Sequence, residues 1–368
     1  MGPRLIGALA RRLFLNMDGP LLAIVTMILI GGLFTLYSAT SDQPARFSSQ
    51  LMNIGVGFVA MWLAAQVSPQ TLMRLALPLF LVGLALLVGV ALHGEVVNGA
   101  RRWLHVGVTR IQPSEVMKIA MPMVLAWFFH RSQEGLRFRE FAVAAIAVVI
   151  PSWLIARQPD LGTAMLVVAA GFYVIFLAGL SWKIIVGFAL AGGASLPFVW
   201  SMMHDYQRKR LRTLIDPSED PLGAGYHTIQ STIAVGSGGP FGKGWMHGTQ
   251  THLEFIPERH TDFIFAVFSE EFGLLGNLIL VTLYIALITR GMVIAANAPT
   301  FFARLLAGAL VLVLFTYAFV NMGMVSGILP VVGVPLPFVS YGGTALVTLF
   351  IAIGILMSIA KHRQLVQS

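Results

Sequence analysis

Residues Phe255–Gly276 read FIPERHTDFIFAVFSEEFGLLG and join the one long polar segment of the chain to an apolar run of membrane-spanning length. Carboxylates at or inside a membrane cost free energy unless they are paired, hydrated or functional. The stretch therefore predicts a membrane helix with a candidate active site at its polar start. Its ionisable side chains are Glu258, Arg259, His260, Asp262, Glu270 and Glu271.

The composition of the whole chain agrees with a membrane protein. Of its 368 residues, 57% are hydrophobic and only 11% are charged, which is less than half the charged share of a soluble domain. There are no cysteines, so disulfides and thiolate chemistry are excluded. The net charge of +8 could suggest nucleic acid, but the charges lie in loops between apolar runs, so we expect no nucleic-acid partner.

Apolar length predicts about ten membrane spans. The first is expected to be uncleaved because it has full membrane length. Arginines precede it, and this places both termini of an even-span protein in the cytoplasm. The expected spans are 19–39, 47–66, 72–92, 114–130, 140–156, 161–180, 183–203, 262–289, 303–327 and 342–360.

With this topology, most acidic residues fall in outer loops or at their edges, so we expect chemistry on the outer face. We predict an all-α polytopic membrane protein that forms one domain over 1–368, with a large extracytoplasmic loop over 204–261 between spans seven and eight. The basic run Arg208–Arg212 in that loop could bind a pyrophosphate or anionic membrane lipid, and we favour lipid.

The segment Asn98–Lys118 holds the first polar constellation. Glu115 and Lys118 are three residues apart and share one helix face; they form either a structural ion pair or the wall of a polar cavity. Arg101 and Arg102 lie on the outer face against the topology rule, so an anion is expected to hold them. That anion is either a phospholipid headgroup or a substrate pyrophosphate.

Asp160 and Asp262 both precede apolar runs, where a carboxylate can cap a helix. For Asp160, capping alone is a sufficient explanation. Thr261 or Asp262 could cap the eighth span in the same way. Asp262 also precedes an apolar face, where partial desolvation would raise the pKa of its carboxyl group, as a general base near neutral pH requires.

The segment Val325–Thr344 is broken by prolines and glycines between two apolar runs. Irregular backbone at membrane depth survives only when it is buried in protein or lines a cavity, so we expect a re-entrant or pocket-lining segment. Ser340 lacks an accompanying base and is not expected to be a nucleophile. The glycine-rich run Gly236–Gly244 is not preceded by a strand, so we reject a phosphate-loop interpretation.

At these positions the chain resembles the SEDS family (shape, elongation, division and sporulation), and it is most similar to the elongation branch of that family. The resemblance covers the chain from about residue 98 to the end. The matching pieces are NGARRWL, QPSEVMK, QPDLGTA, QSTIAVGSGG, FIPERHTDFIF, EEFG and PFVSYGG.

The resemblance implies a ten-span peptidoglycan glycosyltransferase in the bacterial cytoplasmic (inner) membrane. It implies that lipid II is polymerised into a growing glycan strand on the outer face, with a class B penicillin-binding protein and other elongation-complex membrane proteins as partners. Asp262 matches the family's essential aspartate, and Glu115, Lys118 and Asp160 match its polar cavity. We add Arg101, Arg102, Arg259 and His260 as expected substrate-binding residues.

The chemistry of the residues agrees with this reading. Asp262 can take the proton of an acceptor hydroxyl as general base, and a single inverting displacement needs no covalent intermediate. Arginines, lysines or a divalent cation (Mg²⁺ or Mn²⁺) could stabilise the pyrophosphate leaving group; no cofactor is certain. Two other functions stay open, a flippase or transporter for a lipid-linked sugar and a non-catalytic scaffold for a penicillin-binding protein.

Overall fold

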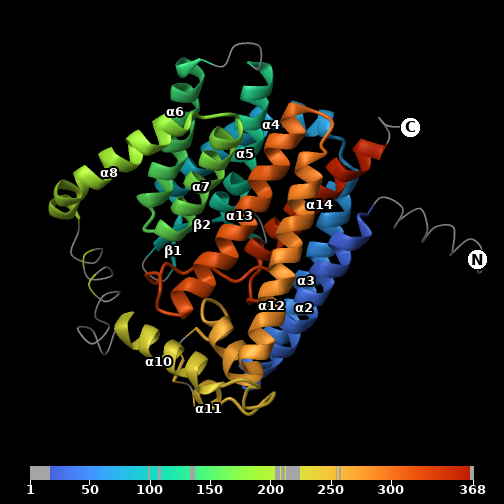
Figure 1. Ribbon diagram of the computed structural model, residues 1–368, viewed down its shortest axis with the longest axis vertical. Helices are drawn as coiled ribbons and strands as arrows, with labels where there is room; N and C mark the ends of the chain where they lie inside the picture. Colours follow the sequence, from blue (N-terminus) through green and yellow to red (C-terminus); the bar gives the residue numbers. More distant parts are fainter. Residues whose placement is uncertain are drawn as a thin grey trace, which may run out of the picture.

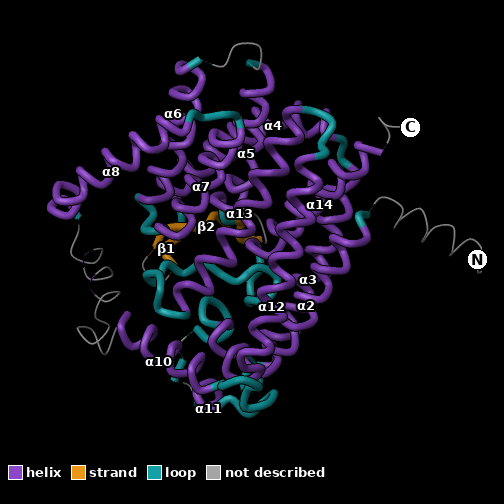
Figure 2. Tube along the Cα trace, viewed as in Figure 1, coloured by secondary structure: helices purple, strands orange, loops and turns teal. Residues whose placement is uncertain are grey.

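The computed structural model describes residues 17–97, 100–106, 109–132, 137–203, 208, 212, 224–253, 255–256 and 258–364. Within them the chain is mostly helical (Figures 1 and 2). The helices are α2 (Gly19–Ala39), α3 (Pro44–Gln66), α4 (Pro69–His93), α5 (Pro113–Arg131), α6 (Phe138–Ala156), α7 (Leu161–Leu177), α8 (Trp182–Met202), α10 (Ala224–Ser237), α11 (Thr249–His252), α12 (Ile264–Ala296), α13 (Phe301–Val325) and α14 (Thr344–Gln364).

The expected spans coincide with α2 to α8 and α12 to α14, with shifted boundaries. Among the described helices, seven are long and apolar enough to cross a membrane: α2, α3, α4, α6, α12, α13 and α14. Large apolar side chains on their outer faces are exposed, for example Met52 and Leu92, as expected where lipid is the solvent. The protein is therefore an integral membrane protein, and the count of ten spans stays a prediction.

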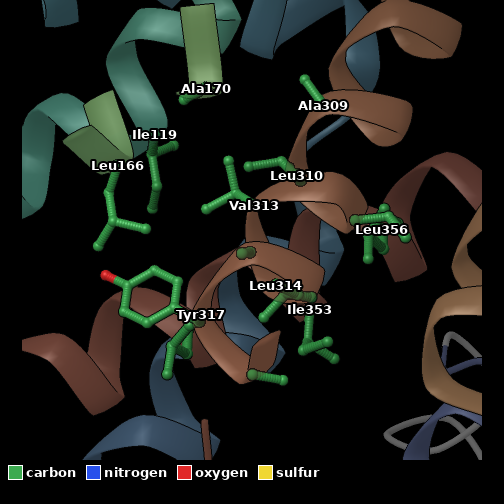
Figure 3. Close-up of a cluster of buried hydrophobic side chains, with 14 of the residues drawn as sticks. Ile119, Leu166, Ala170, Ala309, Leu310, Val313, Leu314, Tyr317, Ile353 and Leu356 are labelled. Carbon is green, nitrogen blue, oxygen red and sulfur yellow. The ribbon is translucent and has the colours of Figure 1, made fainter. Parts of the chain in front are cut away.

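The core forms where α13 packs against α5, α7, α12 and α14. Figure 3 shows the apolar side chains that meet there, with Leu310 and Val313 of α13 toward Ile119 and Leu166, and Leu314 beside Ile353. Tyr317 lies at the edge of this cluster, and it is only 1% exposed. Because α13 is buried over most of its length, it is a fixed support for polar groups at its end.

A small three-stranded antiparallel sheet was not foreseen. Its strands are β1 (Glu95–Val97), β2 (Ala100–Val106) and β3 (Thr109–Ile111), in the order β1-β2-β3. Pairing places Glu95 opposite Trp103 and Leu104 opposite Ile111. The fold is thus mainly α with one small sheet, and the sheet carries the basic segment to the start of α5.

The described part of the expected loop 204–261 is not extended. It contains α10, which packs on α12 and α13, and the short α11 (Figure 1). Arg208 donates to the backbone carbonyl groups of Trp200 and Ser201 at the end of α8. The residues between Arg208 and Arg212 lie outside the described residues, as does most of the loop before α10.

The glycine-rich run packs on a kink in α12. Gly273 interrupts that helix with φ +64°, and a Cβ there would lie 2.2 Å from the backbone N of Gly242. The N–H groups of Lys243 and Gly244 donate to the carbonyl groups of Glu270 and Glu271. The glycines are therefore needed for close backbone contact, which agrees with rejecting a phosphate loop.

Candidate active site

Asp262 lies in the turn that leads into α12, and its carboxylate does not cap the helix. The N-cap residue is Phe263, with no side-chain cap bond. Thr261 Oγ1 instead donates to the backbone and side chain of Glu258. The expected capping role of Thr261 or Asp262 is therefore wrong, because the turn Glu258–Thr261 uses the hydroxyl group for itself.

The Asp262 carboxylate lies in a partly buried position. Among the described residues it makes no hydrogen bond or ion pair within bonding distance, although its backbone carbonyl accepts from Asn321 Nδ2 at 2.8 Å. Burial, helped by the charge of Glu258, raises the pKa of Asp262 to about 6, and Arg102 opposes this rise. An ionised but weakly solvated carboxylate near neutral pH is well suited to accept a proton.

The irregular segment 326–343, between α13 and α14, lies against this turn. Asn321 Nδ2 also donates to the Val334 carbonyl at 2.7 Å, and Ser340 Oγ donates to the Thr261 carbonyl at 2.7 Å. A Cβ on Gly333, where φ is +73°, would be 3.2 Å from Asp262 Oδ2. The expectation of buried broken backbone is confirmed, and Ser340 acts as a structural hydrogen-bonding residue.

Asp160 belongs to a second polar group beside this turn. Its Oδ1 accepts from the Thr163 N–H at 3.1 Å and caps α7, which confirms the capping interpretation. Its Oδ2 accepts from Gln112 Nε2 at 3.3 Å and lies 3.7 Å from Arg102 Nε. Capping thus leaves one oxygen of Asp160 directed toward Gln112 and Arg102.

Arg102 lies beside Asp160, and its charge also acts on Asp262. Its guanidinium donates to the Pro159 carbonyl at 2.8 Å and also acts electrostatically on Asp262. About a third of its side chain is exposed, 37%, so it can meet an anion from solvent. The side chain of Arg101 lies outside the described residues.

Glu115 and Lys118 form the expected pair in the first turns of α5. Lys118 Nζ lies 2.7 Å from Glu115 Oε1, and both side chains are nearly buried. Lys118 also donates to the hydroxyl group of Tyr317 on α13 at 2.5 Å. Glu115 Oε2 is buried without a partner among the described residues, so one acceptor remains available for a ligand or a water molecule.

Arg259 and His260 line a different polar cavity. Arg259 donates to the carbonyl groups of Ala39 and Thr251 and pairs with Asp42 at 2.7 Å. His260 contacts the guanidinium of Arg46. Both residues therefore face the α2–α3 turn.

Glu270 and Glu271 are both buried, at 0% and 1% exposure. Glu270 accepts from Lys243 Nζ at 2.7 Å and from the backbone N–H of Gln250 at 2.9 Å, and Glu271 accepts from the hydroxyl group of Ser38. Glu270 thus joins the α10–α11 connection to α12, and Glu271 joins α2 to α12. Both hold the helix that follows Asp262.

Sequence reasoning missed Gln112, Tyr317, Asn321 and Gly333. Tyr317 and Asn321 are four residues apart on α13 and share one helix face. This polar pair in an apolar helix was the one signal that could have indicated Tyr317 and Asn321.

Among the described residues no group of three or more His, Asp or Glu side chains gathers around a metal position. Mg²⁺ commonly takes one or two carboxylates plus substrate phosphate oxygens, and Asp160 or Asp262 would supply such a carboxylate; a metal requirement stays a prediction.

Comparisons with known proteins agree on one family. The FtsW/RodA/SpoVE family model, described as "Cell cycle protein", matches residues 18–365. The chain is 49% identical over 351 residues to the peptidoglycan glycosyltransferase MrdB of Escherichia coli K12, covering 95% of each chain. It is 37% identical over 359 residues to the stage V sporulation protein E of Bacillus subtilis, covering 93% of this chain and 96% of that protein.

Solved structures show the same similarity. A chain of a peptidoglycan synthase complex that coordinates polymerisation and crosslinking matches with a TM-score of 0.82 and 33% identity, over 94% of this chain and 98% of that one. The rod shape-determining protein RodA of Thermus thermophilus matches with a TM-score of 0.70 and 30% identity, over 94% and 97%.

Proposed function

Because the chain belongs to the FtsW/RodA/SpoVE family, we propose that it polymerises lipid II into glycan strands during cell elongation. The reaction class follows from that membership, since relatives named peptidoglycan glycosyltransferases cover nearly the whole chain. The chain is accordingly a glycosyltransferase embedded in the membrane.

The protein lies in the bacterial cytoplasmic membrane with both termini in the cytoplasm and ten spans. This topology puts the turn Glu258–Phe263, β2 and the start of α7 on the outer face. The acceptor strand would then grow outside the cell, where it is used. The bias of arginine and lysine toward the opposite loops supports this orientation.

The reaction needs one displacement at the anomeric carbon of the donor sugar. The acceptor hydroxyl oxygen forms the new glycosidic bond, the bond from the anomeric carbon to the pyrophosphate oxygen breaks, and the hydroxyl proton moves to Asp262. The donor is α-linked and the product β-linked, so one inversion is sufficient. The single observation that carries this role is the partly buried carboxylate of Asp262, which lacks a bonded partner among the described residues and has a pKa near 6.

The departing polyprenyl pyrophosphate needs positive charge near it. Arg102 is the partly exposed cation beside Asp160 whose charge also acts on Asp262, and we assign it to that role. Lys118 is largely neutralised by Glu115, so it shapes the cavity. A divalent cation would supply further charge if held by Asp160 or Asp262 together with phosphate oxygens.

The partner is a class B penicillin-binding protein, which would cross-link the new strand. The structural neighbour from a complex that couples polymerisation and crosslinking supports this assignment. Other elongation-complex membrane proteins are expected on the same grounds.

A flippase is the second candidate function, since polar groups within a bundle also suit a transporter. Purified wild-type protein, reconstituted in vesicles with lipid II and the partner transpeptidase, separates the two. The proposal predicts glycan polymer of increasing length. Movement of lipid II between leaflets without polymer would identify a flippase instead of a polymerase. Absence of both activities would identify a scaffold.

A further inference from the structure

Two neighbouring cavities lie at the turn between α2 and α3. One is polar, has a volume of about 230 Å³ and is lined by Arg46, Glu258, Arg259 and His260 among others. The second is apolar, has a volume of about 310 Å³ and is lined by Leu33, Phe34, Tyr37, Phe47 and Trp245. The consecutive residues Arg46 and Phe47 of α3 line one cavity each, and their Cα atoms are about 3.8 Å apart.

The polar cavity has two arginines, Arg46 and Arg259, and one carboxylate, Glu258, in its wall. Arg259 is matched by Asp42 at 2.7 Å. Arg46 contacts the ring of His260, and among the described residues it has no carboxylate within ion-pair distance. The Arg46 guanidinium is therefore available to a phosphate oxygen.

The apolar cavity is built from a fixed aromatic cluster. The rings of Phe34 and Trp245 have centroids 5.8 Å apart, and those of Tyr37 and Phe47 are 5.2 Å apart. Trp245 Nε1 donates to the Phe34 carbonyl at 2.9 Å, which fixes the indole ring. The cavity volume is at the lower end of the range for ligand pockets, so it suits a single hydrocarbon chain.

We propose that the two cavities together bind a second polyprenyl pyrophosphate lipid, separate from the departing one at Arg102, with the pyrophosphate at Arg46 and the chain along Phe34, Tyr37 and Trp245. An anion site and an apolar site lined by consecutive residues match a molecule with a charged head and an apolar tail. One narrow cavity accommodates one chain, whereas a glycerophospholipid carries two.

The position of the polar cavity favours a lipid of the reaction over a bulk lipid. His260 lies two residues before Asp262, and its carbonyl accepts from the Tyr341 N–H at 2.8 Å. Glu258, which lines the same cavity, raises the pKa of Asp262. The site therefore adjoins the reacting turn, and the inference rests on the proposed glycosyltransferase function.

The test measures binding of undecaprenyl pyrophosphate to full-length purified protein in detergent, by native mass spectrometry. Arg46→Gln should weaken binding about tenfold or more, the loss expected for one charge-assisted hydrogen bond. The matched control is Arg74→Gln, at an exposed arginine on α4, and it should bind as wild type does. Unchanged binding by Arg46→Gln would overturn the proposal.

A second variant tests the chain site independently. Phe34 is 52% exposed, so Phe34→Ala should fold normally, as thermal unfolding will verify. It should weaken binding of undecaprenyl pyrophosphate but leave binding of inorganic pyrophosphate, which has no chain, unchanged. An equal effect on both probes, or no effect on either, would contradict the assigned chain position; this result decides the matter if Arg46→Gln does not fold.

A competition arm identifies the source of the lipid. Phosphatidylglycerol should not displace undecaprenyl pyrophosphate at equal concentration. Displacement that depends on Arg46 would show a general phospholipid site. Failure of wild type to bind any probe would leave only an interfacial aromatic cluster. Either result overturns the inference.

Asp262→Ala should still bind the probe. Binding without polymer formation by wild type would instead contradict the glycosyltransferase proposal and leave the site standing.

Discussion

Gly333 lies directly against the carboxylate of Asp262: a Cβ on Gly333 would be 3.2 Å from Asp262 Oδ2. Gly333 also has φ +73°, a conformation that costs a residue with a side chain about 1–2 kcal/mol. The segment 326–343 therefore approaches the candidate base as bare backbone. Glycine at position 333 leaves space beside the carboxylate, because any side chain there would touch Asp262.

Gly333→Ala should lower the polymerisation rate by more than the loss of folded protein can explain. The methyl group crowds and further desolvates Asp262, so the acidic limb of the pH–rate profile should move to higher pH. Gly343→Ala is the matched control, because a Cβ there meets only Asn53 Nδ2 at 3.9 Å. Equal loss of activity in both variants would show that the segment, and not the contact with Asp262, is responsible.

The pH dependence of wild-type polymerisation should show an ionisation near pH 6. A general base works only when deprotonated, so the rate should rise with pH below about 6 and level off above it, following the pKa of Asp262. Initial rates with lipid II between pH 5 and 8 provide the measurement. A rate that is flat across this window would exclude Asp262 as a base with a raised pKa.

Asp262→Asn should be inactive yet at least as stable as wild type. The native pKa of Asp262, about 6, is above the ordinary value of 3.8, so ionisation opposes folding. This penalty is absent below pH 4, grows between pH 4 and 6 and is complete above pH 6. It amounts to roughly 1–3 kcal/mol after discounting for partial exposure. Thermal unfolding at pH 4 and pH 7.5 should show the variant's advantage only at the higher pH; a loss of stability at pH 7.5 would contradict it.

The Glu115–Lys118 pair can be tested for its two open roles. Lys118→Met leaves Glu115 buried without its cation and should cost about 3–5 kcal/mol. The double variant Lys118→Met/Glu115→Gln removes the unpaired charge and should recover much of that stability. If the pair also forms the cavity wall, the double variant remains inactive. Recovery of both stability and activity would identify a purely structural ion pair.

Apolar length was enough to locate the helices, because backbone groups in a membrane must be satisfied within each span. The three-residue spacing of Glu115 and Lys118 likewise predicted a contact inside one helix. The bond from Lys118 to Tyr317 joins residues 199 positions apart, and no local pattern indicates such a pairing. The same is true of Gly333 beside Asp262, since that contact depends on how segment 326–343 folds back.

The errors have local physical causes. Thr261 was expected to be a possible cap for α12, but its hydroxyl group is used by Glu258. Arg259 and His260 were expected to bind substrate; they line a cavity at the α2–α3 turn, and their role stays a prediction. Side chains at neighbouring positions in a tight turn point in different directions, and these two face the α2–α3 turn. The sheet was missed because its strands are short and lie among polar residues.

The most direct measurement compares glycan polymerisation by wild type and Asp262→Ala, each purified at full length and supplied with lipid II and the partner transpeptidase. The account predicts polymer from wild type and a rate lower by about 10²–10⁴-fold in the variant, the usual contribution of a general base. Thermal unfolding must show that the variant is folded. Polymer formation by folded Asp262→Ala at the wild-type rate would contradict the central claim.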